Sequence, residues 1–385
     1  MSCILPFINL EARTDGTMSV CCIMQESAKK DNGIEFNLAN GDTLSDVKNS
    51  KWLKDIQNKF LNNEKLEACN NCWHEEEAGI QSKRLRENFY WGENFTPNLK
   101  ALDLKLGNIC NSKCRICSSF ASSQWAAEEI KINPNNEGAK KFNKLGMWPK
   151  TNENFWEDID DHLQNIEKLE FFGGEPLMIE RHYEILERCV ELGIAKNISL
   201  SYNTNGSIFP EDKIVLWEQF KKVEIFLSID DINERFEYIR FPGNFAEVIT
   251  NLGHFSKLNP DIFSIGIFQT ISIFNIMHMT ELTDFISKHF DEIHIHYNMV
   301  FTPSHISPKV LPKRVKEKIN ILYGKSNADH VNNTLKFMNG EQYNSSEFTN
   351  FLIQTKQIDK FRKEQFNKVF PKFYKLIEKD WNGIQ

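Results

Sequence analysis

The stretch that decides the fold is LKALDLKLGNICNSKCRIC at residues 99–117, together with IEKLEFFGGEP at residues 166–176. Each begins as a run of apolar, β-prone residues. The first ends in a loop with three cysteines, and the second ends in a pair of glycines. In a barrel of parallel strands, functional groups gather on the loops that follow the strands. The two stretches therefore predict successive strands whose loops contribute to one site.

The chain beyond these stretches continues the alternation of strands and helices. We expect four further strands, at residues 197–204, 223–229, 263–273 and 292–300. Apolar residues at intervals of three and four predict helices around residues 118–130, 179–193, 211–221, 244–256 and 278–290. This alternation predicts an α/β fold with a parallel sheet, either open or closed into a barrel.

Composition excludes several classes of protein. The 385 residues are 41% hydrophobic and 26% charged, which is typical of folded globular proteins. The net charge of −7 provides no global positive field that would attract nucleic acid. No segment approaches the roughly 18 apolar residues of a membrane helix, and the N-terminus has no secretory pattern, so we expect a cytoplasmic protein. Nine cysteines in a reducing compartment indicate metal ligands or catalytic groups instead of disulfides.

The spacing of Cys110, Cys114 and Cys117 is the most informative feature. Three thiolates on one loop can reach one face of an iron–sulfur cluster, whereas a [4Fe–4S] cluster held by protein alone takes four. One iron is then left open for a substrate or cofactor. The Gly173–Pro176 turn, one strand later, lets backbone approach a ligand closely, and Glu175 can accept hydrogen bonds from an ammonium group.

These motifs resemble the radical S-adenosylmethionine (SAM) superfamily. The resemblance covers about residues 99–302 and includes SYNTNG at residues 201–206 and LSID at residues 227–230. It implies a partial (β/α)6 barrel with a [4Fe–4S] cluster on the three cysteines and SAM on the open iron. Reductive cleavage of SAM would give a 5′-deoxyadenosyl radical that abstracts hydrogen from a substrate. An electron donor such as flavodoxin or ferredoxin is implied as a partner.

The same resemblance assigns contacts with SAM. Gly173, Gly174, Glu175 and Pro176 are expected to hold the methionyl ammonium, and backbone near Ile116 the adenine. Further positions are expected to contact the ribose or the SAM carboxylate: Asn203, Ser228, Asp230 and Arg240. Ser228 and Asp230 are expected to hydrogen bond to the ribose hydroxyls, and Arg240 is expected to pair with the SAM carboxylate. Taken singly, Asn203, Ser228 and Asp230 are also suited to capping the ends of strands.

A second cysteine set lies in the N-terminal part. Asp15-Gly16 predicts a tight turn that brings Cys3 and Cys21 together, and Cys69 and Cys72 follow after a linker. The pattern resembles the auxiliary-cluster fold called twitch, a relative of the SPASM domain. It implies a second [4Fe–4S] cluster on these four thiolates, with Cys22 as an alternative to Cys21 and a zinc ion as an alternative to the cluster.

These features divide the chain into three parts. We expect an auxiliary-cluster module at residues 1–97, the barrel at residues 98–305 and a helical C-terminal extension at residues 306–385. Residues 356–380 hold eight Lys or Arg against four Asp or Glu, interleaved with phenylalanines. They predict an amphipathic helix packed on the body and broken at Pro371, or a surface that binds peptide or nucleic acid.

Three functions are compatible with the sequence. The first is a radical SAM enzyme that acts on a peptide or protein side chain, as many twitch and SPASM members do. The second is the same chemistry on a sugar, nucleotide or amino acid. The third is a non-catalytic binding protein stabilised by zinc. His294 and His296 share one face of the sixth predicted strand, directed either into the barrel or to the surface.

Overall fold

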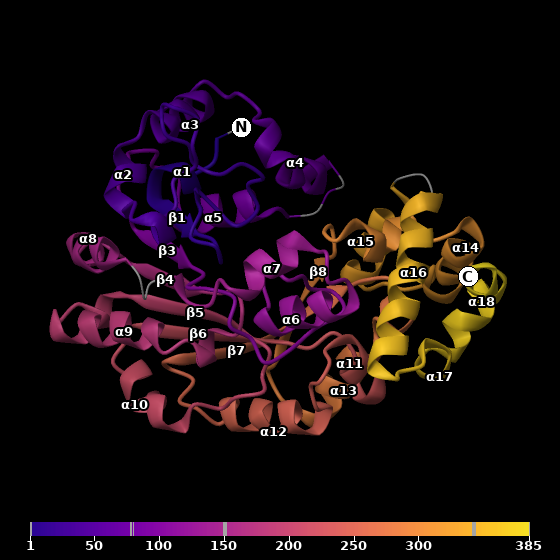
Figure 1. Ribbon diagram of the computed structural model, residues 1–385. Helices are drawn as coiled ribbons and strands as arrows, with labels where there is room; N and C mark the ends of the chain where they lie inside the picture. Colours follow the sequence, from indigo (N-terminus) through magenta and orange to yellow (C-terminus); the bar gives the residue numbers. More distant parts are fainter. Residues whose placement is uncertain (1, 78, 80, 149–151, 341–343, 385) are drawn as a thin grey trace.

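A single eight-stranded sheet forms the centre of the molecule (Figure 1). The computed structural model describes residues 2–77, 79, 81–148, 152–340 and 344–384. In spatial order the strands are β2 (Met18–Ser19), β1 (Asn9–Ala12), β3 (Ala101–Leu104), β4 (Lys168–Phe171), β5 (Ser199–Thr204), β6 (Lys222–Ser228), β7 (Phe263–Ile271) and β8 (His294–Met299). The β1–β2 pair is antiparallel, and every other neighbouring pair is parallel.

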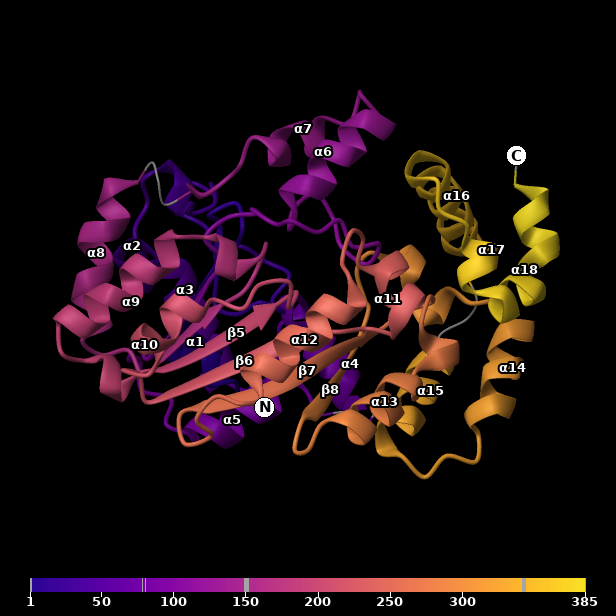
Figure 2. The ribbon, with the colours of Figure 1, turned by 90° about the horizontal axis from the view of Figure 1, so that it is seen from below.

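Helices cover the sheet and its two ends. Those before β8 are α1 (Leu5–Ile8), α2 (Leu44–Asn49), α3 (Lys51–Leu61), α4 (Asn70–Glu77), α5 (Lys83–Trp91), α6 (Ser123–Ile132), α7 (Glu137–Asn143), α8 (Glu153–Leu163), α9 (Arg181–Glu191), α10 (Ile214–Trp217), α11 (Asn233–Ile239), α12 (Phe245–Phe255) and α13 (Glu281–His289). Those after β8 are α14 (Lys313–Tyr323), α15 (Asp329–Asn339), α16 (Ser345–Arg362), α17 (Phe366–Val369) and α18 (Pro371–Gly383). In Figure 2, α9 and α12 run along the sheet, and α14–α18 gather beyond one end of it.

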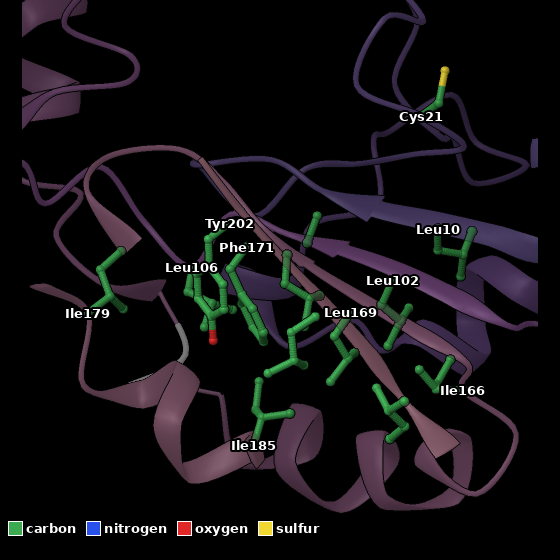
Figure 3. Close-up of a cluster of buried hydrophobic side chains, with 14 of the residues drawn as sticks. Leu10, Cys21, Leu102, Leu106, Ile166, Leu169, Phe171, Ile179, Ile185 and Tyr202 are labelled. Atoms are coloured by element: carbon green, nitrogen blue, oxygen red, sulfur yellow. The ribbon is translucent and has the colours of Figure 1, made fainter. Parts of the chain in front are cut away.

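The two faces of the sheet differ because side chains alternate along each strand. In β6, Val223, Ile225 and Leu227 are fully buried, whereas the residues between them are partly exposed. Figure 3 shows how the buried face of the neighbouring strands packs: Leu102, Leu169 and Tyr202 point towards Ile185 of α9. The opposite face lines the inside of the partial barrel.

The structure confirms the α/β class and all six predicted strands, each within one residue of its predicted range. The sheet is larger than predicted, because β1 and β2 extend it at the β3 edge. The turn at Gly16, where φ is +83°, joins these two short strands as expected. Since β1 pairs with β3 from Asn9 to Ala12, the sheet crosses the predicted domain boundary between residues 97 and 98.

The C-terminal helices enclose a second hydrophobic core. Phe366, Phe370 and Phe373 are fully buried in it, which confirms that the tail packs on the body. Phe361 differs from them and is 42% exposed. Pro371 starts α18 after α17 has ended, so the tail turns between two helices. Within the described residues, no helix is long and apolar enough to cross a membrane.

Candidate functional site

The cysteine loop follows β3 and is held by the C-terminal end of α11. Lys113 donates its backbone N–H to Phe241 O at 2.7 Å, and Arg115 donates to Ile239 O at 2.7 Å. Cys110 and Cys114 are buried, whereas Cys117 is only half-buried. The thiols are therefore carried by backbone that is fixed on both sides of Cys114.

Two arginines tie this loop to the C-terminal region. The Arg115 guanidinium stacks on the Tyr238 ring at 3.7 Å and donates to Asp359 at 2.6 Å and Glu364 at 2.7 Å. Arg362, at the end of α16, donates to Lys113 O at 2.7 Å. The Arg115 and Asp359 side chains are 1% and 10% exposed, and breaking a buried pair typically costs about 3–5 kcal/mol. Nothing in the sequence predicts these contacts, and the hydrogen bonds join residues more than 200 positions apart.

The GGEP turn lies directly against the cysteine loop. Glu175 donates its backbone N–H to Ile109 O at 2.7 Å. Gly174 has φ of +60°, and a Cβ at this position would lie 2.4 Å from Ile109 O. The close approach that the paired glycines predicted is therefore an approach to the backbone that precedes Cys110, which fixes the turn beside the thiols.

The Glu175 side chain was expected to face a ligand, but the structure turns it inward. Its carboxylate is fully buried and accepts hydrogen bonds from Thr204 Oγ1 at 2.7 Å, Asn205 N at 2.7 Å and Leu177 N at 3.2 Å. Burial raises the pKa of Glu175 to about 7, although these hydrogen bonds act to lower it. Glu175 therefore fastens the GGEP turn to the end of β5.

Asn205, which the sequence did not single out, joins the loops after β3 and β5. Its Nδ2 donates to Asn111 Oδ1 at 2.7 Å and lies 3.3 Å from Ser112 Oγ. Asn111 in turn donates to Ser207 Oγ at 2.8 Å. The cysteine loop, the GGEP turn and the SYNTNG segment are thus locked together at the carboxyl ends of β3, β4 and β5.

Asp230 and Arg240 were expected to contact different parts of a ligand, and the structure pairs them with each other. Asp230 Oδ2 accepts from Arg240 Nε at 2.7 Å, and its Oδ1 accepts from Thr270 N at 2.9 Å. The Asp230 carboxylate is therefore engaged within the protein. Arg240 Nη1 and Nη2 make no hydrogen bond to any described residue, and the guanidinium is close enough to Cys114 and Cys117 to favour their thiolates.

The remaining predicted SAM contacts border this centre. Asn203 Oδ1 is buried and has no hydrogen-bond partner among the described residues, which is costly unless a ligand satisfies it. Ser228 ends β6 and is half-buried, and Ile116 lies between two of the cysteines. The unpaired amide oxygen of Asn203, and the Arg240 guanidinium with two nitrogens left unbonded near Cys114 and Cys117, fit a polar, charged ligand at this position.

The thiols carry the chemistry that a metal cluster needs. Burial raises the pKa of Cys117 to about 12 and also raises the pKa values of Cys110 and Cys114, so the free thiols are neutral near pH 7. Metal ligation requires thiolates, and bound iron would supply the positive charge that stabilises them. Within the described part of the chain, no three His, Cys, Asp or Glu side chains form a ready site for a single metal ion.

The second cysteine set converges on one small cavity of about 20 Å³ in the N-terminal part. Cys3, Cys21, Cys69 and Cys72 all line it, with Arg84 among the other lining residues. Burial raises the pKa values of all four thiols. The turn at Gly16 and the start of α4 thus bring together four side chains that span 70 residues of sequence.

Cys22 is separate from this set. Its Sγ accepts a hydrogen bond from Lys83 Nζ at 3.2 Å, and it lines a different cavity of about 760 Å³. Ile23 and Lys83 line both cavities and so stand between them. Of the two neighbouring cysteines, Cys21 is the one that faces Cys3, Cys69 and Cys72.

The larger cavity is lined by Ile116 of the cysteine loop and shares Ile23 and Lys83 with the smaller cavity. One wall is β8 with the loop that follows it, the other is formed by α4 and α5, and Ile116 of the cysteine loop reaches its border. His296 of β8 is exposed and contacts Phe226 at 5.2 Å and Phe268 at 5.4 Å between ring centroids. Phe226 and Phe268 belong to the partly exposed face of β6 and β7, so His296 faces the inside of the partial barrel.

Comparison with known families agrees with the site. Residues 104–284, just under half of the chain, match the model of the Radical SAM superfamily. The matched segment runs from the end of β3 into α13 and includes all three cysteines of the loop. No curated protein matches the chain.

Solved structures with similar folds are distant. Native anSMEcpe with bound AdoMet is 17% identical, with a TM-score of 0.39 over 69% of this chain and 62% of that chain. Streptococcus suis SuiB bound to precursor peptide SuiA is 12% identical, with a TM-score of 0.33 over 82% of this chain and 56% of that chain. The chain thus spans less than two thirds of either protein.

Proposed function

We propose that the chain is a radical SAM enzyme in which Cys110, Cys114 and Cys117 hold a [4Fe–4S] cluster. SAM would bind to the fourth iron, between the cysteine loop and the carboxyl ends of the strands. When bound and reduced, this pair supplies a 5′-deoxyadenosyl radical that abstracts hydrogen from the substrate. The chain's own residues orient SAM and exclude water from it.

Arg240 is the observation that carries this proposal. One edge of its guanidinium is fixed by Asp230 at 2.7 Å, and Nη1 and Nη2 are left without a described partner beside Cys114 and Cys117. A guanidinium held in this way suits two parallel hydrogen bonds to a carboxylate. We assign it to the SAM carboxylate, with Asn203 Oδ1 and the main chain of Gly173–Pro176 as acceptors for ligand donors. Ser228 and the backbone near Ile116 would complete the site towards the ribose and adenine.

We assign a second [4Fe–4S] cluster to Cys3, Cys21, Cys69 and Cys72. Their convergence on one cavity supports this assignment, since four thiolates suffice for a cluster without an open iron. Arg84 is close enough to Cys3 and Cys72 to offset the negative charge of their thiolates. The N-terminal part would then be an auxiliary-cluster module of the twitch kind.

We propose a peptide or protein side chain as the substrate, bound in the cavity between β8 and α4–α5. β8 is the last strand of the sheet, and Val300 donates its N–H to Ile271 O at 3.1 Å, so the backbone groups of Ile295, Tyr297 and Met299 point away from β7. No described residue hydrogen bonds to them. An extended peptide can add to such a free edge while one of its side chains enters the barrel.

Anaerobic reconstitution followed by iron and sulfide analysis tests the two assignments. About eight irons per chain are expected, and Cys114→Ala and Cys69→Ala should each lose about half of them. Zinc without sulfide would contradict the cluster assignment and favour a binding protein. Unchanged iron in Cys69→Ala would contradict the second site alone.

A further inference from the structure

The C-terminal helices carry a basic surface on an acidic protein. Residues 356–380 contain eight Lys or Arg and four Asp or Glu, although the whole chain has a net charge of −7. Three of these acids are already paired: Asp359 and Glu364 with Arg115, and Asp380 with Arg314. Six lysines are exposed and make no ion pair with a described residue: Lys360, Lys363, Lys368, Lys372, Lys375 and Lys379. Within residues 356–380, the positive charge of the exposed lysines is therefore largely uncompensated.

The lysines lie on adjoining elements. Lys363 and Lys368 line one surface cavity of about 560 Å³ at the junction of α16, α17 and α11, and Glu234 and Glu237 of α11 line its other side. Lys372, Lys375 and Lys379 follow one another at intervals of three and four, so they lie along one face of α18. We refer to the six residues together as the lysine surface. Figures 1 and 2 show α16–α18 at one end of the molecule, with α3 towards the other.

The part of the lysine surface on α16 is coupled directly to the cysteine loop. Arg362, between Lys360 and Lys363, donates to Lys113 O at 2.7 Å and lies 5.2 Å from the Trp125 ring. Trp125 Nε1 in turn donates to Cys117 O at 2.9 Å. Cys117 is also the least buried of the three thiols. One ring and one guanidinium thus separate a candidate cluster ligand from this surface.

We propose that the lysine surface docks an acidic one-electron carrier protein that reduces the site on the cysteine loop. The inference rests on the proposed function, since reductive cleavage of SAM takes one electron that the polypeptide cannot supply. The carrier, a flavin or iron–sulfur protein, loses one electron and the enzyme gains one, and no bond changes at the interface. Complementary charge steers such encounters and can raise association rates by roughly 10- to 1000-fold.

Binding of a purified oxidised flavodoxin, measured by calorimetry, tests the docking independently of turnover. We expect Lys360→Glu/Lys363→Glu/Lys368→Glu to raise the Kd about tenfold, and binding by the unaltered chain to weaken with salt. Lys51→Glu/Lys54→Glu/Lys59→Glu is the matched control: these α3 lysines are also exposed, and none pairs with a described residue. Its Kd should not change. Equal affinity in both variants would overturn the proposal, as would a single-stranded oligonucleotide that binds through these lysines while flavodoxin does not.

Chemical reduction separates this inference from the proposed function. With dithionite, the α16–α17 variant should form 5′-deoxyadenosine at the rate of the unaltered protein, and with reduced flavodoxin about tenfold more slowly. Iron content and circular dichroism check that the variant is folded and loaded. Absence of product from the iron-loaded, unaltered protein with dithionite would refute the proposed function and leave the binding result to decide the docking. Equal rates with flavodoxin would refute the docking alone.

Discussion

Replacing Gly174 with alanine should push the GGEP turn away from the cysteine loop. A Cβ on Gly174 would lie 2.4 Å from Ile109 O, closer than real side chains approach a backbone atom. The same oxygen accepts the N–H of Glu175 at 2.7 Å. The turn therefore cannot keep this hydrogen bond and also accommodate the methyl group.

Gly193 provides a matched control for the size of this effect. Its φ is +70°, close to the +60° of Gly174, but nothing lies within 4 Å of an added Cβ. Gly193→Ala should lower the free energy of unfolding only through the strain of an alanine in the left-handed region, about 1–2 kcal/mol. Gly174→Ala should also lose the Glu175 hydrogen bond, about 1 kcal/mol, and weaken the bonds of the Glu175 carboxylate. We expect it to lower the free energy of unfolding by about 2 kcal/mol more than the control.

Urea unfolding of both variants, followed by tryptophan fluorescence on the metal-free chain, measures this difference. The iron bound after reconstitution reports on the site itself, because Cys110 follows the displaced carbonyl. We expect Gly174→Ala to retain less iron than Gly193→Ala. Equal losses of stability, or full iron in both, would refute the idea that the turn fixes the loop.

Three further outcomes follow from contacts outside the turn. Asp359→Asn should destabilise the chain by about 2 kcal/mol and reduce the iron retained, because Arg115 loses one of its two carboxylate partners and keeps only Glu364; unchanged urea midpoints would contradict this. Burial lowers the pKa of His182 to about 3, so this group's contribution to stability is full above pH 6.5 and falls as the pH drops towards 3. His182→Gln should therefore flatten the pH dependence of unfolding by about 2 kcal/mol between pH 6.5 and 4.5, and an identical slope would contradict the assignment. Finally, Cys21→Ala should lose about half of the iron and Cys22→Ala none, since Cys22 lines the other cavity; the reverse result would exchange their roles.

The sequence predicted the elements whose pattern is local. The six predicted strands appear as apolar runs followed by turn residues, and the cysteine spacing is visible within eight residues. Strand β1 (NLEA) was missed as a member of the sheet because its parallel partner β3 begins 89 residues after the last of these residues. Its pairing depends on tertiary contacts.

The sequence named residues that the structure brings to the candidate site, but it did not predict which of them contact one another. Asp230 and Arg240 were each expected at the ligand, but a buried carboxylate next to an arginine is stabilised most by that arginine. Glu175 likewise binds the end of β5, since Thr204 and Asn205 supply donors that burial makes necessary. Sequence spacing shows which groups are available, and only the fold shows which of them are already paired.

Formation of 5′-deoxyadenosine from SAM tests the central claim most directly. Anaerobically reconstituted protein with dithionite should produce it, Cys114→Ala should produce none, and Cys69→Ala should still produce it from the site on the cysteine loop. Undiminished product in Cys114→Ala would contradict the account, because an open iron held by these three thiols would then not be where SAM is cleaved.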